Sequence, residues 1–93
     1  MELRDINGVQ KGQLVRSLAG RDKDKFYLVL NREGDMLFLA DGRKRGVQNP
    51  KKKNIRHVQS CNRIAADAAA GLQGGTMRDE EIRAGIRRLT IND

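Results

Sequence analysis

The sequence predicts a small, mainly β domain followed by one or two C-terminal helices. Short apolar runs alternate with turn residues over the first sixty positions, and at about Ser60 the composition changes to an alanine-rich stretch and then an amphipathic one. Regularly spaced short strands with turn signals between them are typical of a small barrel. We therefore expect a barrel over residues 1–60 and a helical appendage over residues 61–93.

Three strand patterns lie in the first half of the chain, at about 13–18, 25–32 and 36–40. The second, KFYLVLNR, is almost unbroken in its apolar character, which indicates burial on both faces or a place in the wall of a closed barrel. The tight-turn signal Glu33-Gly34-Asp35 separates the second strand from the third. Residues 1–12 are polar and are interpreted as a leader into the first strand.

The region after the third strand is broken by turn residues. Asp41-Gly42 is a turn pair, and Gly46-Val47 could form a short fourth strand. Asn49-Pro50 breaks the chain, because proline lacks a donor and biases its predecessor away from helix. The run from Asn54 to Val58 alternates apolar and polar residues, as a half-buried strand does. Four or five strands are therefore expected in all.

The last third of the chain predicts two helices. Residues 62–72 carry an apolar stripe at helical spacing, and glycines follow it. A second helix is expected from Thr76, with acidic residues in its first turn and arginines in its last, as the helix dipole favours. Its apolar face consists of Ile82, Ile86 and Leu89.

Charge is distributed unevenly along the chain. The formal net charge is +7, and residues 1–60 contain fourteen lysines and arginines against seven acids, whereas residues 61–93 contain five of each. A basic domain followed by a neutral segment is typical of a polyanion-binding module with an appendage.

Residues suited to catalysis are scarce. The chain has one histidine, His57, and one cysteine, Cys61, and no further thiol or imidazole to complete a zinc site. It contains neither a P-loop nor a dinucleotide-binding glycine pattern. We therefore expect a protein that is not an enzyme and that uses no cofactor or metal.

Three basic clusters follow turns or breaks in the expected strand order. On a small barrel, loops from successive hairpins can gather at one rim, where their cations would form a phosphate-binding surface. Nearby aspartates at 22, 24 and 41 could orient arginines or serve ordinary turn chemistry. The clusters are Arg21, Lys23 and Lys25; Arg43, Lys44 and Arg45; and Lys51, Lys52 and Lys53, with Arg56 and His57 just beyond.

The aromatic content narrows the class of polyanion. Only Phe26, Tyr27 and Phe38 are aromatic, all within expected strands, so a base-stacking platform is not expected. No continuous basic helix is available for the major groove. Backbone and shape recognition of structured RNA fits this composition best.

The stretch from Gln13 to Lys25, with its apolar run, Ala19-Gly20 turn and charged loop, resembles the KOW element. The Asp41-Gly42 pair with Arg45 and the Pro50-to-Asn54 tract extend the resemblance to small KOW-domain proteins similar to archaeal and eukaryotic large-subunit ribosomal proteins. It covers roughly residues 12–58.

This resemblance implies an SH3-like barrel that binds RNA, in particular ribosomal RNA, without catalysis. Gly20 would be the KOW glycine, at a turn where a side chain would obstruct the backbone. Asp24 departs from the pattern, because relatives often have glycine there. Together with the three clusters, Arg56 and His57, the expected RNA-binding residues include Arg16, Ser17 and Gly20.

A second hypothesis is an adaptor, in which the barrel binds a protein of the transcription or translation machinery and residues 61–93 provide a second binding surface. Attachment to an anionic membrane is not expected, since the helices lack a lysine-rich face opposite Trp or Phe. The lone cysteine, the absence of a long apolar run and the polar N-terminus favour the cytoplasm.

Overall fold

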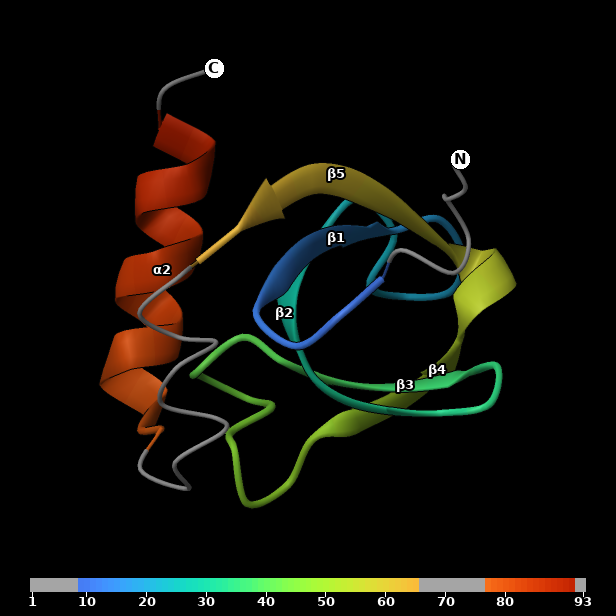
Figure 1. Cartoon of the computed structure of the whole chain (residues 1–93), viewed down its shortest axis with the longest axis horizontal. Coiled ribbons are helices and arrows are strands. Elements are labelled where there is room, and N and C mark those ends of the chain that lie inside the picture. Colours follow the sequence, from blue (N-terminus) through green and yellow to red (C-terminus); the bar gives the residue numbers. More distant parts are fainter. Residues whose placement is uncertain (1–8, 66–76, 92–93) are drawn as a thin grey trace.

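The computed structural model describes residues 9–65 and 77–91, and within them five strands form one antiparallel sheet (Figure 1). The order across the sheet is β4-β3-β2-β1-β5. The sheet curls into a half barrel and one helix, α2, lies against its outer side. The elements are β1 (Gln13–Ser17), β2 (Phe26–Glu33), β3 (Met36–Ala40), β4 (Lys51–Asn54), the 3-10 turn η2 (Ile55–His57), β5 (Val58–Ile64) and α2 (Asp79–Ile91). The predicted mainly β class is confirmed.

The first three strands agree with their predicted positions within a residue or two, but the region after them does not. Gly46-Val47 is not a strand: the Val47 N–H is bonded to the Asp79 carboxylate at 2.7 Å rather than to a neighbouring strand. The lysine tract, expected in a loop, forms β4 instead.

The predicted strand from Asn54 to Val58 is also wrong over its middle. The Asn54 side chain accepts a hydrogen bond from the Arg56 N–H at 3.0 Å, which starts the η2 turn and delays β5 until Val58.

The helix predicted over 62–72 is wrong over residues 62–65. β5 continues through Ile64, which pairs with Gln13 of β1, and the next residue, Ala65, donates its backbone N–H to the Gly12 carbonyl at 2.9 Å. Residues 66–72, like Thr76, lie outside the described residues. The second predicted helix is confirmed as α2. At its start Glu81 accepts the backbone N–H of Arg78 at 2.9 Å, the reciprocal half of a capping box.

The apolar run of β2 is buried on both faces, which is one of the two arrangements that its composition predicts. Its inward side chains, Tyr27 and Val29, join the cluster inside the curled sheet. Its Leu28 points the other way, into a second cluster that includes Ile82 of α2. A strand covered on both sides has no polar face to alternate with, which explains the continuous hydrophobic sequence.

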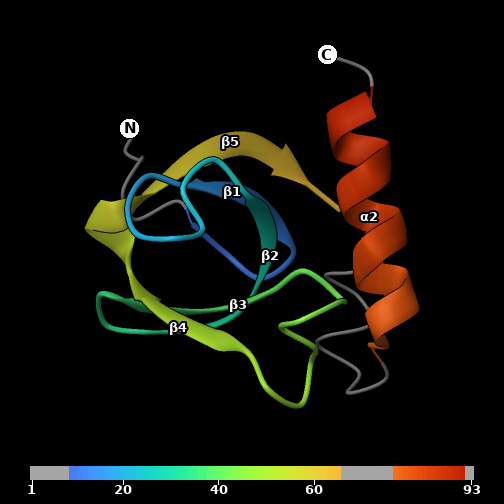
Figure 2. The same cartoon turned by 180° about the vertical axis from the view of Figure 1, so that it is seen from behind.

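Helix α2 packs closely on the outer side of the sheet (Figure 2). A Cβ at Gly85 would lie 3.2 Å from Leu28 Cδ1, so the missing side chain lets the helix approach β2. Near its C-terminal end, the Leu89 carbonyl accepts a hydrogen bond from Arg63 of β5 at 2.8 Å. Ile82, Ile86 and Leu89 all face the sheet, as predicted.

The described helix is too short and too polar to cross a membrane.

Candidate nucleic-acid interface

A buried carboxylate lies in the loop between β1 and β2. Asp22 is 7% exposed. Its oxygens accept hydrogen bonds from Ser17 Oγ and Tyr27 OH, each at 2.9 Å, and from Lys53 Nζ at 3.1 Å. Lys51 Nζ lies 3.3 Å away as an additional ion-pair partner. Four donors from three segments therefore converge on one side chain.

These partners set the protonation of the network. Burial alone would raise the pKa of the Asp22 carboxyl, but its four donors, Lys53 foremost, hold that pKa well below its usual range. Burial and the adjacent carboxylate raise the pKa of the Tyr27 hydroxyl above its ordinary value. Asp22 therefore stays ionised and Tyr27 stays protonated over the physiological range.

The register of β4 explains why only part of the lysine tract reaches Asp22. Lys53 pairs with Leu37 and Lys51 with Leu39, and these two leucines face the interior. Directly opposed residues of an antiparallel pair share a face, so both lysines point inward. Lys53 also donates to the Ala19 carbonyl at 2.9 Å, which ties the edge strand to the loop.

Lys52 points to the opposite face of β4. Its ammonium lies 5.8 Å from the centre of the Phe38 ring, and its side chain is exposed. Of the three lysines predicted to bind phosphate, Lys52 is thus the one presented to solvent, whereas Lys51 and Lys53 are held by Asp22.

The β1–β2 loop presents its cations around this buried centre. Arg21, Lys23 and Lys25 are all exposed. Gly20 has a φ of +87°, and a Cβ there would lie 3.5 Å from Asp22 Oδ1. That distance is an ordinary contact, so the glycine is required by its left-handed backbone rather than by obstruction.

Asp24 also has a left-handed backbone, with a φ of +73°. Aspartate tolerates this conformation better than most residues do, although glycine adopts it without strain. The Asp24 carboxylate lies 3.9 Å from Arg16 Nη1, which is a long, exposed contact. Of the three aspartates, Asp24 is the one whose carboxylate stays mainly in solvent.

The loop after β3 carries the second cluster and is shaped by hydrogen bonds. Asp41 Oδ1 accepts the backbone N–H groups of Arg43 at 2.8 Å and Arg45 at 3.0 Å. From α2, Asp79 binds the Val47 N–H and Arg83 donates to the Gly42 carbonyl. The loop is thereby fixed to the helix, while the Arg43 and Lys44 side chains remain exposed.

The remaining predicted residues have different environments. Ser17 is fully buried and serves the Asp22 network. Arg16 lies on the outer face of β1 and donates to Gln59 Oε1 at 2.8 Å. Arg56 and His57 are exposed in η2, next to the start of the β1–β2 loop, because the His57 carbonyl accepts the Leu18 N–H at 2.8 Å.

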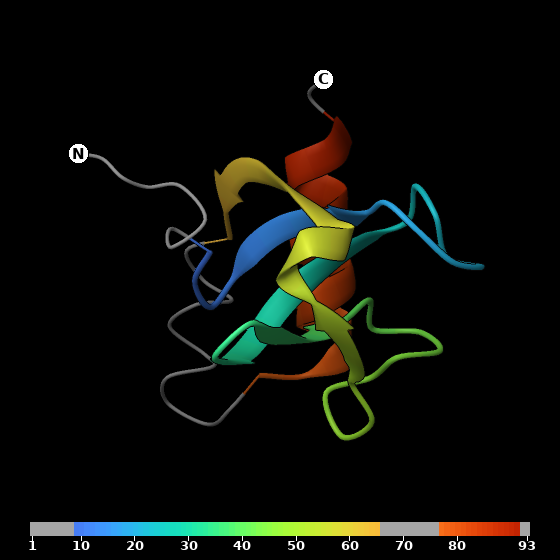
Figure 3. The same ribbon diagram turned by 90° about the vertical axis from the view of Figure 1, so that its right-hand side faces the viewer.

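The β1–β2 loop and the loop after β3 project to the same side of the molecule (Figure 3). Lys25 from the first and Arg43 from the second line one pocket, together with Arg83 and Arg87 of α2. The loop that carries the first cluster meets the third cluster at Asp22, and the first and second clusters meet at this pocket. The two helix arginines were missed by the sequence analysis, because the segment that carries them has no net charge.

Among the described residues, no three carboxylate, thiol or imidazole groups come together as metal ligands. Cys61 is partly exposed, and its Sγ lies 3.9 Å from the Gln59 carbonyl oxygen.

Comparison with known proteins adds no identity: the sequence matches no protein-family model, and no curated protein matches it.

Proposed function

We propose that this protein binds structured RNA through its sugar–phosphate backbone, without catalysing a reaction. The observation that supports the proposal is the meeting of basic segments far apart in sequence on one side of the half barrel. Asp22 joins the β1–β2 loop to β4, and Lys25 shares a pocket with Arg43. Cations gathered this way can contact successive phosphates and release their counterions.

The contacting set is narrower than the one expected from the sequence. The exposed side chains are Arg21, Lys23, Lys25, Arg43, Lys44, Lys52, Arg56 and His57. Lys51, Lys53 and Ser17 support the loop from inside, so their part in binding is to position it.

The KOW resemblance extends the proposal to a ribosomal RNA target in the cytoplasm. Cosedimentation of the protein with ribosomal particles on a sucrose gradient, at low and at high salt, tests that extension. A protein that stays at the top of the gradient under both conditions would rule out the ribosomal target while leaving RNA binding open.

The direct experiment measures the affinity for a fluorescently labelled RNA stem–loop over a series of salt concentrations. Each phosphate contact contributes about 0.7–0.9 to the log–log slope. Lys23→Ala and Arg43→Ala should each reduce the slope by about that amount. Lys11→Ala is the matched control, because Lys11 is also exposed but lies at the opposite end of β1.

Two outcomes would overturn the proposal. One is an RNA affinity that does not change with salt. The other is an equal effect of the control variant and the loop variants, which would mean that net charge alone is responsible. Retention of a protein partner after ribonuclease treatment, with no RNA binding in dilute buffer, would favour the adaptor role.

A further inference from the structure

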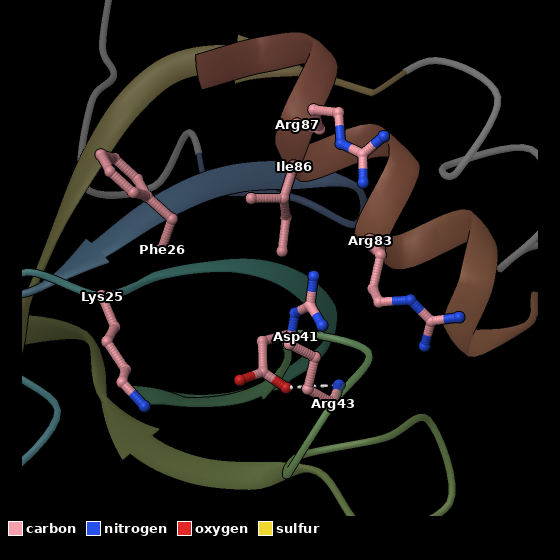
Figure 4. A pocket seen from close by; sticks show the side chains of 7 residues that line it. All are labelled: Lys25, Phe26, Asp41, Arg43, Arg83, Ile86 and Arg87. Atoms are coloured by element: carbon pink, nitrogen blue, oxygen red, sulfur yellow. Dashed lines mark hydrogen bonds between the residues drawn. The ribbon is translucent and has the colours of Figure 1, made fainter. Parts of the chain in front are cut away.

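A pocket of about 310 Å³ lies between the curled sheet and α2 (Figure 4). Its walls come from three separate segments: the start of β2, the loop after β3 and helix α2. The lining residues are Lys25, Phe26, Asp41, Arg43, Arg83, Ile86 and Arg87.

Four of the seven lining side chains are cationic and one is acidic, so the lining has a net positive charge. The Asp41 carboxylate accepts the backbone N–H groups of Arg43 and Arg45. Arg83 donates to the Gly42 carbonyl, but a guanidinium has five N–H donors. Most donors of the pocket therefore remain available for an anion, and the planar guanidinium fits a phosphate in a bidentate manner.

The other wall of the pocket is apolar. Phe26 and Ile86 are each partly exposed, and both pack on the cluster between the sheet and the helix. In Figure 4, Arg43 reaches from its loop toward Ile86, with Lys25 on one side and the helix arginines on the other. A pocket lined by both cationic and apolar side chains is suited to a ligand with an anionic part and a flat apolar part.

We propose that this pocket binds one unpaired nucleotide of an RNA chain. The phosphate pairs with the arginines, and the base lies against Phe26 and Ile86. This inference rests on the proposed function and adds a site to it. A bare phosphate would need no apolar wall, and the volume is at the lower end of the range for small-molecule pockets, which suits a single nucleotide.

The site predicts a preference that the loops alone would not give. Loops that contact only the backbone should bind a fully paired stem and a bulged stem similarly. A pocket that accepts an extruded base favours the RNA in which one base is already unpaired, because no pairing has to be broken.

The experiment compares two labelled RNA stems that differ only by one unpaired bulge nucleotide. The wild-type protein should bind the bulged stem more tightly. Arg87→Ala should weaken binding to the bulged stem about tenfold, the effect of one lost charge-assisted hydrogen bond, and should abolish the preference. Arg87→Lys should lie between the two, since it retains the charge but not the bidentate geometry.

Arg88→Ala is the matched control, because Arg88 is the next residue on the same helix and does not line the pocket. It should retain the preference for the bulge. A double-mutant cycle between Arg43→Ala and Arg87→Ala adds a second readout: the two effects should be non-additive if both side chains bind one phosphate.

Equal affinity of the wild-type protein for both stems would overturn the pocket while leaving backbone binding by the loops intact. So would an Arg87→Ala protein that keeps the bulge preference. Failure of both stems to bind at low salt would instead overturn the proposed function itself. Binding of an acidic peptide in competition with the bulged stem, with no effect of the bulge, would assign the pocket to carboxylates.

Discussion

Asp22→Asn should destabilise the fold strongly even though it retains a side chain of the same size. The change removes the charge that Lys53 and Lys51 face, and the Lys53 side chain is only 11% exposed. Leaving one member of a buried pair uncompensated costs about 3–5 kcal/mol. Because Lys51 is 27% exposed and partly hydrated, we expect a loss of about 2–4 kcal/mol in the free energy of unfolding.

Urea denaturation followed by circular dichroism measures this loss, with the slope of the transition expected to stay unchanged. Asp24→Asn is the matched control: it lies two residues away, its side chain is 66% exposed, and its effect should stay within about 0.5 kcal/mol. The double variant Asp22→Asn/Lys53→Met should recover part of the loss, because the uncompensated ammonium is gone.

The reasoning is refuted if Asp22→Asn unfolds at the wild-type urea concentration. It is also refuted if removing Lys53 in the Asp22→Asn background lowers stability further by the same amount as in the wild type, since that would mean the two groups are not coupled.

Four further predictions concern the scaffold and the lysine tract that it orients. The pKa of Asp22 is lowered in the fold, so its contribution to stability is complete above the unfolded value of about 4 and is lost as the pH falls below it. In Asp22→Asn, the free energy of unfolding should therefore decrease less steeply as the pH is lowered. The pKa of Tyr27 is raised in the fold, so its contribution to stability is complete below about pH 10 and is lost above it. In Tyr27→Phe, the free energy of unfolding should therefore fall less steeply as the pH rises above that value. Gly42→Ala should lower the free energy of unfolding by more than about 2 kcal/mol, because φ is +77° and the new Cβ would collide with the Asp79 carbonyl and Arg83 of α2. Gly34→Ala should cost only about 1 kcal/mol, because the space around it is open although φ is +59°. Thermal melts of the two variants measure the difference. Lys52→Ala should reduce the salt dependence of RNA affinity at unchanged stability, whereas Lys53→Ala should lower the melting temperature. The opposite pattern would show that Lys53 faces solvent and Lys52 faces the interior.

The sequence was sufficient to predict the elements whose structure follows from a local pattern of apolar residues. The apolar run of β2 indicated either burial on both faces or the wall of a closed barrel, and the structure shows the first. The period of Ile82, Ile86 and Leu89 indicated the face that α2 buries. Both are properties of local pattern, and both are confirmed.

What the sequence did not reveal depends on register and on long-range contacts. In the tract Lys51 to Lys53 the three residues are chemically equal, and only pairing with Leu37 and Leu39 determines which two point inward. Likewise, the sequence around Asn54 alternates as a strand does, but in the structure the Asn54 side chain accepts the Arg56 N–H and the chain turns there.

The candidate site was predicted in part. The loop clusters were recognisable as concentrated charge, and the structure brings Lys25 and Arg43 to one pocket. Arg83 and Arg87 were not recognisable, because acids elsewhere in the same segment cancel their charge. Their place beside the barrel loops follows from the packing of α2, which the sequence alone did not predict.

The most direct test of the account is a titration of isotopically labelled protein with the RNA stem–loop, followed by amide chemical shifts in NMR spectra. We expect the largest shifts in the β1–β2 loop at 20–25, the loop at 41–46 and η2, with small shifts around Lys11 and the Gly34 turn. Shifts concentrated at those last two places, or spread evenly over all faces of the molecule, would contradict the convergence of the basic loops on one RNA backbone.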